Sequence, residues 1–425
     1  MNITKLEIHS RINKFALLTF AFLIPFQDYL TSYPFIILSL NWLIEGRFKE
    51  KINAIIKNRF ILLFISFYLV YLFGLIYSSN LDYAFNDLRI KLPLFFFPIF
   101  LSNISFNKEL INKIFSTFIF ACFVAIILCL ISAAYYFFYE GLNNFSYIKL
   151  SIFKHPGYFS LYINLCVIIL FSKIIKKKER FFLSDYLHLI LIFFLGLFIL
   201  MLSSKMAIII LAIELITYIT ILFMKKRWLI SFGTLSIIVL AIVLSNHYFP
   251  SAKGRFVALN HDAIKASSVA NNNITQEKNS NSKKNKYKSS TFLRINILKI
   301  SLQLISENPI LGVGTGDIRQ VLTEKYNSIE GMDIAYEKKL NPHNQYLQTT
   351  IALGFLGLSI LLAMFIIPFY NAYKNKHHIY LMFLLLFGLN LLTDSLLEVQ
   401  AGVMFYGFFN AVLFFSNTNL TDNNG

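Results

Sequence analysis

His343 could carry out proton transfer, and it stands between Pro342 and Asn344. This polar stretch ends a long hydrophilic segment and opens an apolar run that contains Gly354 and Gly357. A neutral imidazole has a pKa near neutrality and can take a proton from a hydroxyl group. We therefore interpret His343 as a candidate catalytic base in the first turn of a helix, where backbone amides face anions. A capping or packing role is the alternative.

A candidate anion-binding residue, Arg294, lies in the segment 291–308. At 100° per residue, this segment predicts an amphipathic helix. Its polar face gathers Asn296, Lys299, Gln303 and Ser306. Arg294 falls on the apolar side with only Ser301 as a polar neighbour, and such an arginine is costly unless it meets an anion or a carboxylate. The expected partner is a substrate phosphate, and the structural alternatives are a snorkelling arginine or an ion pair with Asp394 or Glu398.

Three further cations stand beside apolar runs. Lys205 lies between two such runs, where it predicts either a phosphate contact or a plain interfacial lysine. Arg89 and Lys91 follow the carboxylates Asp82 and Asp87. They are expected either to attract a polyanionic substrate or to pair with those carboxylates.

Two carboxylates, Asp394 and Glu398, lie four residues apart near the end of another apolar run. This spacing predicts that both stand on one face of a helix. Carboxylates near a membrane interior usually pair with a cation or serve a mechanism. Either one could orient His343 or hold an acceptor hydroxyl, and pairing with Arg294 or Lys205 is equally open.

Composition assigns the chain to the membrane proteins, because it is 56% hydrophobic and 14% charged. Soluble domains average roughly 45–50% and 25%. The fold class predicted is all-α, a polytopic transmembrane bundle. Apolar runs long enough to cross the bilayer need about 17–25 residues. We predict about twelve spans, at 14–30, 33–45, 59–77, 88–103, 113–139, 156–174, 186–202, 206–224, 228–245, 345–372, 378–396 and 399–416.

The basic residues give the orientation. They collect in the segments 47–59, 173–180, 225–227 and 374–378, which all fall on one side of twelve spans together with both termini. Because lysine and arginine gather in cytoplasmic loops, both termini are predicted to be cytoplasmic in a multi-pass inner-membrane protein. The net charge of +17 therefore reports topology, and no nucleic-acid partner is expected.

The largest connection, 246–342, is predicted to be a periplasmic loop between spans 1–9 (1–245) and spans 10–12 with a cytoplasmic tail (343–425). Within it, 261–290 is rich in Asn, Ser and Lys, and a flexible tether is expected there. After the amphipathic helix at 291–308, the glycines at 312, 314 and 316 predict either exposed amides that cradle a phosphate or a plain structural turn.

Several motifs resemble the O-antigen ligase family, within the wider group that includes O-antigen polymerases and protein O-oligosaccharyltransferases. The resemblance covers the later half best. It rests on Ser204-Lys205-Met206-Ala207, Arg294, Asn308-Pro309-Ile310-Leu311-Gly312-Val313-Gly314, His343-Asn344 with Gly354 and Gly357, and Asp394 to Glu398 followed by Gln400-Ala401-Gly402. Many relatives place an arginine where this chain has Lys205.

This resemblance implies a periplasmic glycosyltransferase that takes its glycan from an undecaprenyl-pyrophosphate donor, needs no cofactor or metal, and inverts the anomeric carbon. Arg294, Lys205 and Arg89 would bind the donor pyrophosphate, and His343 would act at the acceptor with Asp394 or Glu398 in support. The implied acceptor is lipid A-core, and membrane lipids surround the site. An O-antigen polymerase or a protein O-oligosaccharyltransferase would use the same donor. A lipid-linked glycan transporter or flippase is the alternative from another class.

Overall fold

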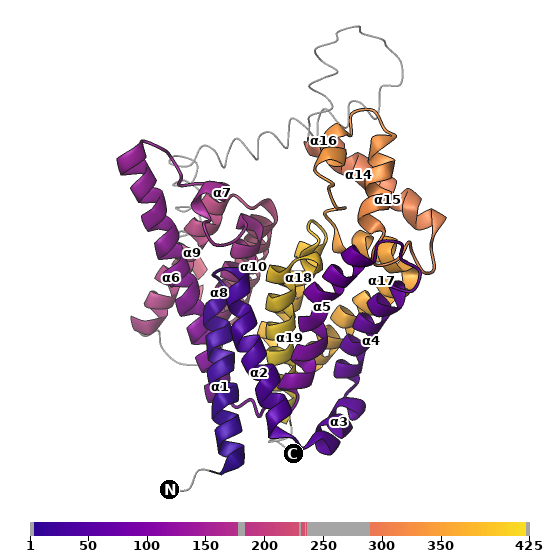
Figure 1. Ribbon diagram of the computed structural model, residues 1–425. Helices are drawn as coiled ribbons and strands as arrows, with labels where there is room; N and C mark the ends of the chain where they lie inside the picture. Colours follow the sequence, from indigo (N-terminus) through magenta and orange to yellow (C-terminus); the bar gives the residue numbers. More distant parts are fainter. Residues whose placement is uncertain (1–3, 177–182, 229–230, 234, 236–289, 422–425) are drawn as a thin grey trace.

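The computed structural model describes residues 4–176, 183–228, 231–233, 235 and 290–421 (Figure 1). These residues form helices and their connections, and no strand occurs among them. The all-α prediction is therefore confirmed for the described part of the chain. The predicted tether at 261–290, except its last residue, and most of the predicted span at 228–245 lie outside it.

The helices follow one another along the chain as in Figure 1. The first half contains α1 (Lys5–Leu23), η1 (Asp28–Thr31), α2 (Ser32–Glu45), α3 (Phe48–Lys57), α4 (Arg59–Gly74), α5 (Leu81–Leu101), α6 (Lys108–Glu140), α7 (Tyr147–Leu150), α8 (Pro156–Lys176), α9 (Leu183–Leu202) and α10 (Lys205–Met224). The second half contains α14 (Ser290–Glu307), α15 (Ile318–Asn327), α16 (Asp333–Glu337), α17 (Gln345–Lys374), α18 (His378–Leu391), η2 (Leu396–Glu398) and α19 (Gln400–Thr421).

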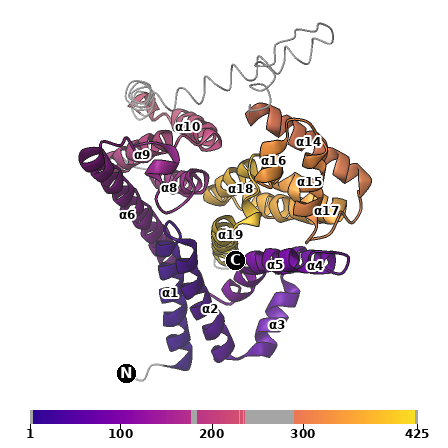
Figure 2. The same ribbon diagram turned by 45° about the horizontal axis from the view of Figure 1, so that its top comes forward.

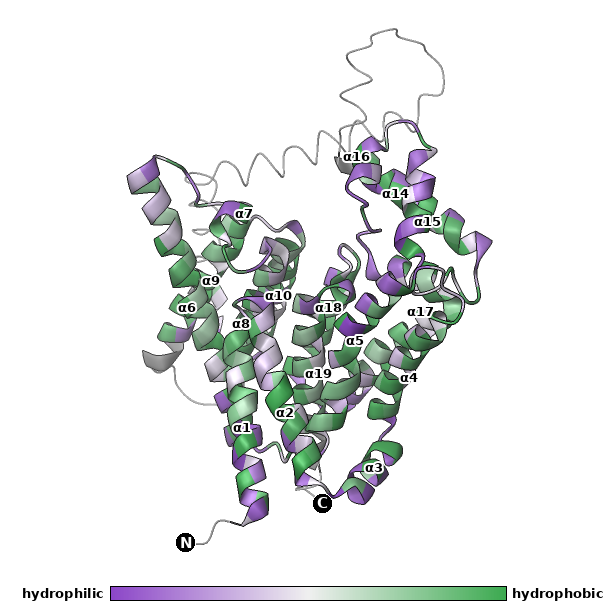
Figure 3. Cartoon of the chain, viewed as in Figure 1, coloured by the Kyte–Doolittle hydropathy of each residue, from purple (hydrophilic) through white to green (hydrophobic). Residues whose placement is uncertain are grey.

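Four described helices, α6, α8, α10 and α17, are long and apolar enough to cross a membrane. The pair α3 and α4, bent by 88°, would add a fifth if it is counted as one span. The other predicted spans outside 228–245 overlap shorter or more polar helices, so the count of twelve stays a prediction. Figure 3 shows the apolar colouring along these helices and the more polar colouring of α3 and of α14–α16.

The core of the bundle is α19, whose residues 401–416 are all buried. Helices from distant parts of the chain pack against it, α5 most extensively, and Figure 2 shows it between α5 and α18. Phe408 stacks on Phe20 of α1 with ring centroids 4.5 Å apart, and Phe414 stacks on Phe60 of α4. On the side of α8, the Tyr162 hydroxyl donates to the Ala401 carbonyl at 2.9 Å.

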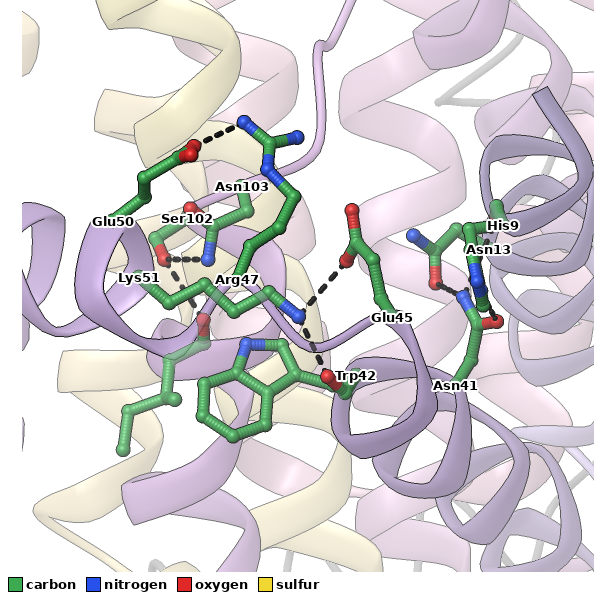
Figure 4. Close-up of polar contacts among 11 residues, drawn as sticks. His9, Asn13, Asn41, Trp42, Glu45, Arg47, Glu50, Lys51, Ser102 and Asn103 are labelled. Atoms are coloured by element: carbon green, nitrogen blue, oxygen red, sulfur yellow. Dashed lines mark hydrogen bonds and ion pairs between the residues drawn. The ribbon is translucent and has the colours of Figure 1, made fainter. Parts of the chain in front are cut away.

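Polar contacts close the end of the bundle where α1 begins and α19 ends (Figures 1 and 4). Lys51 of α3 is buried there, and its ammonium donates to the Trp42 carbonyl at 2.6 Å and pairs with Glu45 at 2.9 Å. Asn41 joins α2 to α1, because it lies 2.7 Å from the His9 ring nitrogen Nδ1. The Lys51 contacts hold α3 against the end of α2, and the Asn41 contact holds α2 against α1.

At the opposite end lie α14, α15 and α16, next to α17 and the start of α5 (Figure 1). The helix predicted at 291–308 is confirmed as α14, whereas α15 and α16 were not predicted. Their attachment depends on a break in α17 at Gly354, which has φ +62° and ψ −161°. Only glycine readily adopts this backbone conformation.

The break lets α17 share its backbone with the loop 308–317. The carbonyls of Ile351 and Ala352, freed from the helix, accept the N–H groups of Val313 and Gly314 at 2.9 Å each. In return, the Phe355 N–H donates to the Pro309 carbonyl at 2.8 Å.

The other side of this loop binds the end of α4, where the Thr315 hydroxyl donates to the Tyr71 carbonyl at 2.7 Å. Gly316 donates its N–H to the Ser78 hydroxyl at 2.9 Å. The glycine-rich amides are thus engaged by the protein itself, and of the two interpretations offered for this run, the structural turn is the correct one.

A Cβ at Gly354 would overlap the Ile310 carbonyl oxygen and force a strained backbone. We predict that Gly354→Ala lowers the free energy of unfolding by at least about 1–3 kcal/mol, the usual cost of such a backbone conformation. The measurement is denaturant unfolding of the purified protein in detergent. Gly196→Ala is the matched control, because a Cβ there meets nothing closer than 3.8 Å. Equal midpoints for the two variants would contradict the proposed importance of the break.

Candidate functional site

His343 lies just outside α17, in the left-handed backbone region with φ +49°. Its N–H donates to the Asn341 side-chain oxygen at 3.0 Å, which closes a tight turn. The next residue, Asn344, is the N-cap, because its side-chain oxygen accepts the Leu347 N–H at 3.1 Å. The placement of His343 in the first helical turn was therefore wrong, and the ring is aimed by the turn that precedes the helix.

Asp394 is the carboxylate whose charge raises the pKa of His343. It stands in the turn after α18, half-buried, and it accepts the Ser395 N–H at 2.9 Å. Burial raises its pKa above the usual value, and the charges of His343, His155 and Arg294 partly oppose that rise. Burial lowers the pKa of His343, Asp394 opposes this, and the Arg294 charge lowers it further. These four residues form one electrostatic cluster, which we call the outer cluster.

Arg294 contributes to the outer cluster from α14. One apolar flank of α14 is buried, at Leu293, Ile297 and Ile300, while Ile295 on the other flank is exposed. Arg294 stands at the boundary of these flanks and is itself exposed. Within the described ranges it forms no ion pair, so the predicted alternative of a pair with Asp394 or Glu398 is not found. Its guanidinium group therefore keeps its capacity for a bidentate contact to an anion.

The start of α8 forms the opposite wall of the outer cluster. The His155 ring nitrogen Nδ1 accepts the Gly157 N–H at 3.3 Å, as expected of a residue that begins a helix. A Cβ at Gly157 would lie 3.4 Å from this nitrogen and 4.0 Å from an Asp394 carboxylate oxygen. Asp394 thus lies close to His155 as well as acting on His343.

Glu398 belongs to a different, deeper group. The Lys91 ammonium pairs with Glu398 at 3.0 Å and also with Asp87, and all three side chains are almost completely buried. The Gln345 amide donates to Glu398 at 2.8 Å and accepts the Leu397 N–H at 2.8 Å. We call these four residues, Lys91, Asp87, Glu398 and Gln345, the inner cluster.

The two carboxylates do not share a helix face, contrary to the prediction from their spacing. The α-helix ends at Leu391, and Glu398 follows in the short 3-10 turn η2. Because the intervening chain is not α-helical, the charge of Asp394 influences His343, whereas Glu398 forms its ion pair with Lys91. Of the alternatives for Lys91, pairing with a carboxylate is the one found.

The remaining predicted cations are Lys205 and Arg89. Lys205 is the first residue of α10, and Asn164 of α8 donates to the Ala207 carbonyl at 3.1 Å beside it. Arg89 is exposed and donates to Asn86 at 2.7 Å, on a different face of α5 from Lys91. The structure thus brings His343, Arg294 and Asp394 together, and the roles of Lys205 and Arg89 stay predictions.

Gln345 was not predicted as a site residue, although it stands two positions after His343. The sequence feature that could have indicated Gln345 is the run of amide and hydroxyl side chains at the start of an apolar helix. Gln345, Gln348 and Thr349 of this run are all buried. Among the described residues, no three His, Cys, Asp or Glu side chains are grouped so that they could hold a metal ion. Independence from metal stays a prediction for the chain as a whole.

Comparison with known protein families tests the resemblance that the sequence motifs indicated. Residues 189–362 match the family model described as O-Antigen ligase. This part of the chain is similar to that family, and we refer to it as the O-antigen ligase domain after the description of the family model. Family members are glycosyltransferase-like enzymes. A search of curated proteins found no match.

The O-antigen ligase domain contains Lys205, Arg294 and His343, whereas Asp394 and the inner-cluster residues Lys91, Asp87 and Glu398 lie outside the matched residues. Both clusters therefore include residues that come before or after the matched range 189–362 in the sequence. The first half of the chain contributes α5 and α8, and the last part contributes the turn after α18.

Lys91 compensates two buried carboxylates, so its removal should be costly. We predict that Lys91→Met lowers the free energy of unfolding by about 3–5 kcal/mol, because it leaves buried charge without a partner. Denaturant unfolding in detergent measures this loss, and adding Asp87→Asn to the variant should restore part of it. The control is Lys113→Met, which breaks an exposed pair with Glu109 and should barely move the midpoint. A Lys91→Met midpoint equal to that of the control would refute the compensating role.

Proposed function

We propose that this chain is a glycosyltransferase of the ligase type, which transfers a glycan from undecaprenyl-pyrophosphate to lipid A-core. The observation that carries the proposal is that the O-antigen ligase domain contributes both Arg294 and His343 to one electrostatic cluster with Asp394. Arg294 can bind an anion, and burial together with the Arg294 charge lowers the pKa of His343, which favours its neutral form. An anion-binding cation beside a neutral imidazole suits the transfer of a glycan from a phosphate-linked donor to a hydroxyl group.

In the proposed reaction, the acceptor hydroxyl gives its proton to His343 while its oxygen attacks the anomeric carbon of the donor sugar. The bond between that carbon and the pyrophosphate oxygen breaks, and undecaprenyl pyrophosphate leaves with the bonding electrons. Arg294, with Lys205, stabilises the negative charge on the leaving group. Asp394 stabilises the imidazolium that forms. A single displacement of this kind inverts the anomeric carbon and draws its driving force from the donor, without metal.

The proposed setting is the inner membrane, with about twelve spans, both termini cytoplasmic and the loop 246–342 periplasmic. The start of α1 and the end of α19 lie at one end of the bundle and α14–α16 at the other (Figure 1), which supports a site on the side opposite the termini. The pyrophosphate would then lie at the outer interface, with its polyprenyl tail between helices.

The direct test is transfer in vitro with purified protein, undecaprenyl-pyrophosphate-linked glycan and lipid A-core, with and without EDTA. We expect product from the wild type in both conditions. We predict that His343→Ala and Arg294→Ala each reduce kcat/KM at least about 100-fold, the usual scale for losing a general base or a charge-stabilising group. Lys299→Ala is the matched control for Arg294, because it also changes an exposed cation on α14.

Other outcomes would redirect the proposal. Lengthened lipid-linked glycan without any lipid A-core product would make the chain a polymerase with the same donor. A reaction abolished by EDTA would contradict the metal-free mechanism. Absence of both products, where a known ligase is active, would favour glycan transport over transfer.

The pH profile gives a second, independent test. Because burial and Arg294 hold the pKa of His343 below its ordinary value, kcat/KM should be constant near neutral pH and fall only in acid. Replacing Asp394 by Asn removes a charge that raises this pKa, so the acid limb should move to lower pH. Replacing Arg294 by Gln removes a charge that lowers it, so the limb should move to higher pH. Limbs that do not shift in these opposite directions would exclude His343 as the titrating base.

A further inference from the structure

A concave site lies beside the inner cluster, between the start of α5 and the helices α15 and α16. Its volume is about 450 Å³, within the range of roughly 300–1,000 Å³ usual for small-ligand pockets. Its lining includes Asn80, Tyr83, Arg319, Asn327, Tyr336 and Lys339. None of these residues is used by the reaction proposed above, and all of them except Asn80 and Tyr83 belong to helices that the sequence did not predict or to their flanks.

The pocket walls are fixed by the protein before any ligand binds. Asp317 precedes α15, and its carboxylate accepts the N–H groups of Ser79 and Asn80, each at 2.8 Å to one of its oxygens. Gly316 lies so close to the Asn80 carbonyl that a Cβ would overlap the oxygen. The N-terminal ends of α5 and α15 are therefore held together, and the space between them does not need to be formed by an incoming molecule.

The lining chemistry suits a ligand rich in hydroxyl groups. Asn80 and Asn327 each offer both donors and acceptors, and the rings of Tyr83 and Tyr336 present flat apolar faces with a polar edge. Arg319 and Lys339 add positive charge and Glu324 adds a negative charge, so the lining offers hydroxyl groups both charged donors and a charged acceptor. A nucleotide would meet no glycine-rich phosphate loop among these residues.

The pocket is also connected to the reaction site. Tyr83 lies close enough to Glu398 and Lys91 on one side, and to Arg319 on the other, for these charges to act on its hydroxyl. Glu398 in turn binds Gln345, two residues after His343. Tyr83, Glu398 and Gln345 thus link the pocket to the start of α17, which His343 precedes.

We propose that this pocket binds several consecutive sugars of a glycan chain, as a subsite that holds a substrate of the proposed transfer reaction while its end is at His343. This rests on the proposed function for the identity of the glycan. Donor glycan and acceptor core share the chemistry that the pocket recognises, and the experiment below separates them.

The test is calorimetric titration of the full chain in nanodiscs with two probes. One is the free oligosaccharide released from the lipid-linked donor by mild acid, and the other is the core oligosaccharide released from lipopolysaccharide. Tyr336→Ala and Arg319→Ala should each weaken binding of at least one probe by about 10-fold, which corresponds to about 1.4 kcal/mol. Tyr336→Phe keeps the ring and should bind within a few-fold of the wild type. Lys338→Ala, an exposed neighbour of Lys339 outside the lining, is the matched control and should bind as the wild type does.

Weakening for the donor probe assigns the subsite to the donor, and weakening for the core probe assigns it to the acceptor. Unchanged binding in Tyr336→Ala and Arg319→Ala, or no binding of either probe to the wild type, would overturn the proposal. Because the titration requires no turnover, these results are distinct from a failure of the transfer assay. A chain that binds a probe through these residues but makes no product would retain the subsite and lose the proposed reaction.

Discussion

The break of α17 at Gly354 is the constraint on which the rest of the outer structure depends. A continuous helix would keep the carbonyls of Ile351 and Ala352 for itself, and the loop 308–317 would have no backbone partners on that side. Because buried backbone groups must be paired, the exchange of hydrogen bonds fixes the loop, and with it the ends of α14 and α15. The position of Arg294 relative to His343 is thus set by a glycine eleven residues beyond the histidine.

Charge is arranged in two layers at this end of the bundle. In the inner cluster, one ammonium and one amide engage buried carboxylates, so Lys91 and Gln345 stabilise the structure and tie α5, α17 and η2 together. In the outer cluster, Arg294 makes no ion pair with any residue that the structure describes, and Asp394 is left to act on His343. Lys91 is thus engaged in structural pairs, whereas Arg294 is left available for the anion of the proposed reaction.

Much of this arrangement was predictable from sequence, because hydropathy and helical periodicity indicate where helices form and which residues lie on one face. The positions of α14 and α17 and the pairing of Lys91 with a carboxylate followed from residue pattern. The separation of Asp394 from Glu398 did not, since an i, i+4 spacing carries meaning only while the helix continues, and α18 ends at Leu391. The pocket beside α5 was equally invisible, because Asn80 and Arg319 meet through the Asp317 contacts between segments more than 200 residues apart in sequence.

The buried position of α19 has a consequence for the biogenesis of the protein. Translation proceeds from the N-terminus, so α1, α4, α5 and α8 are made before the helix that packs between them. Until residues 401–416 emerge, Phe20, Phe60 and Tyr162 lack the partners that they contact in the finished bundle. The nascent chain must therefore keep an unfilled centre, held by lipid or by the insertion machinery, and a ribosome that stalls shortly before α19 leaves a product without its core.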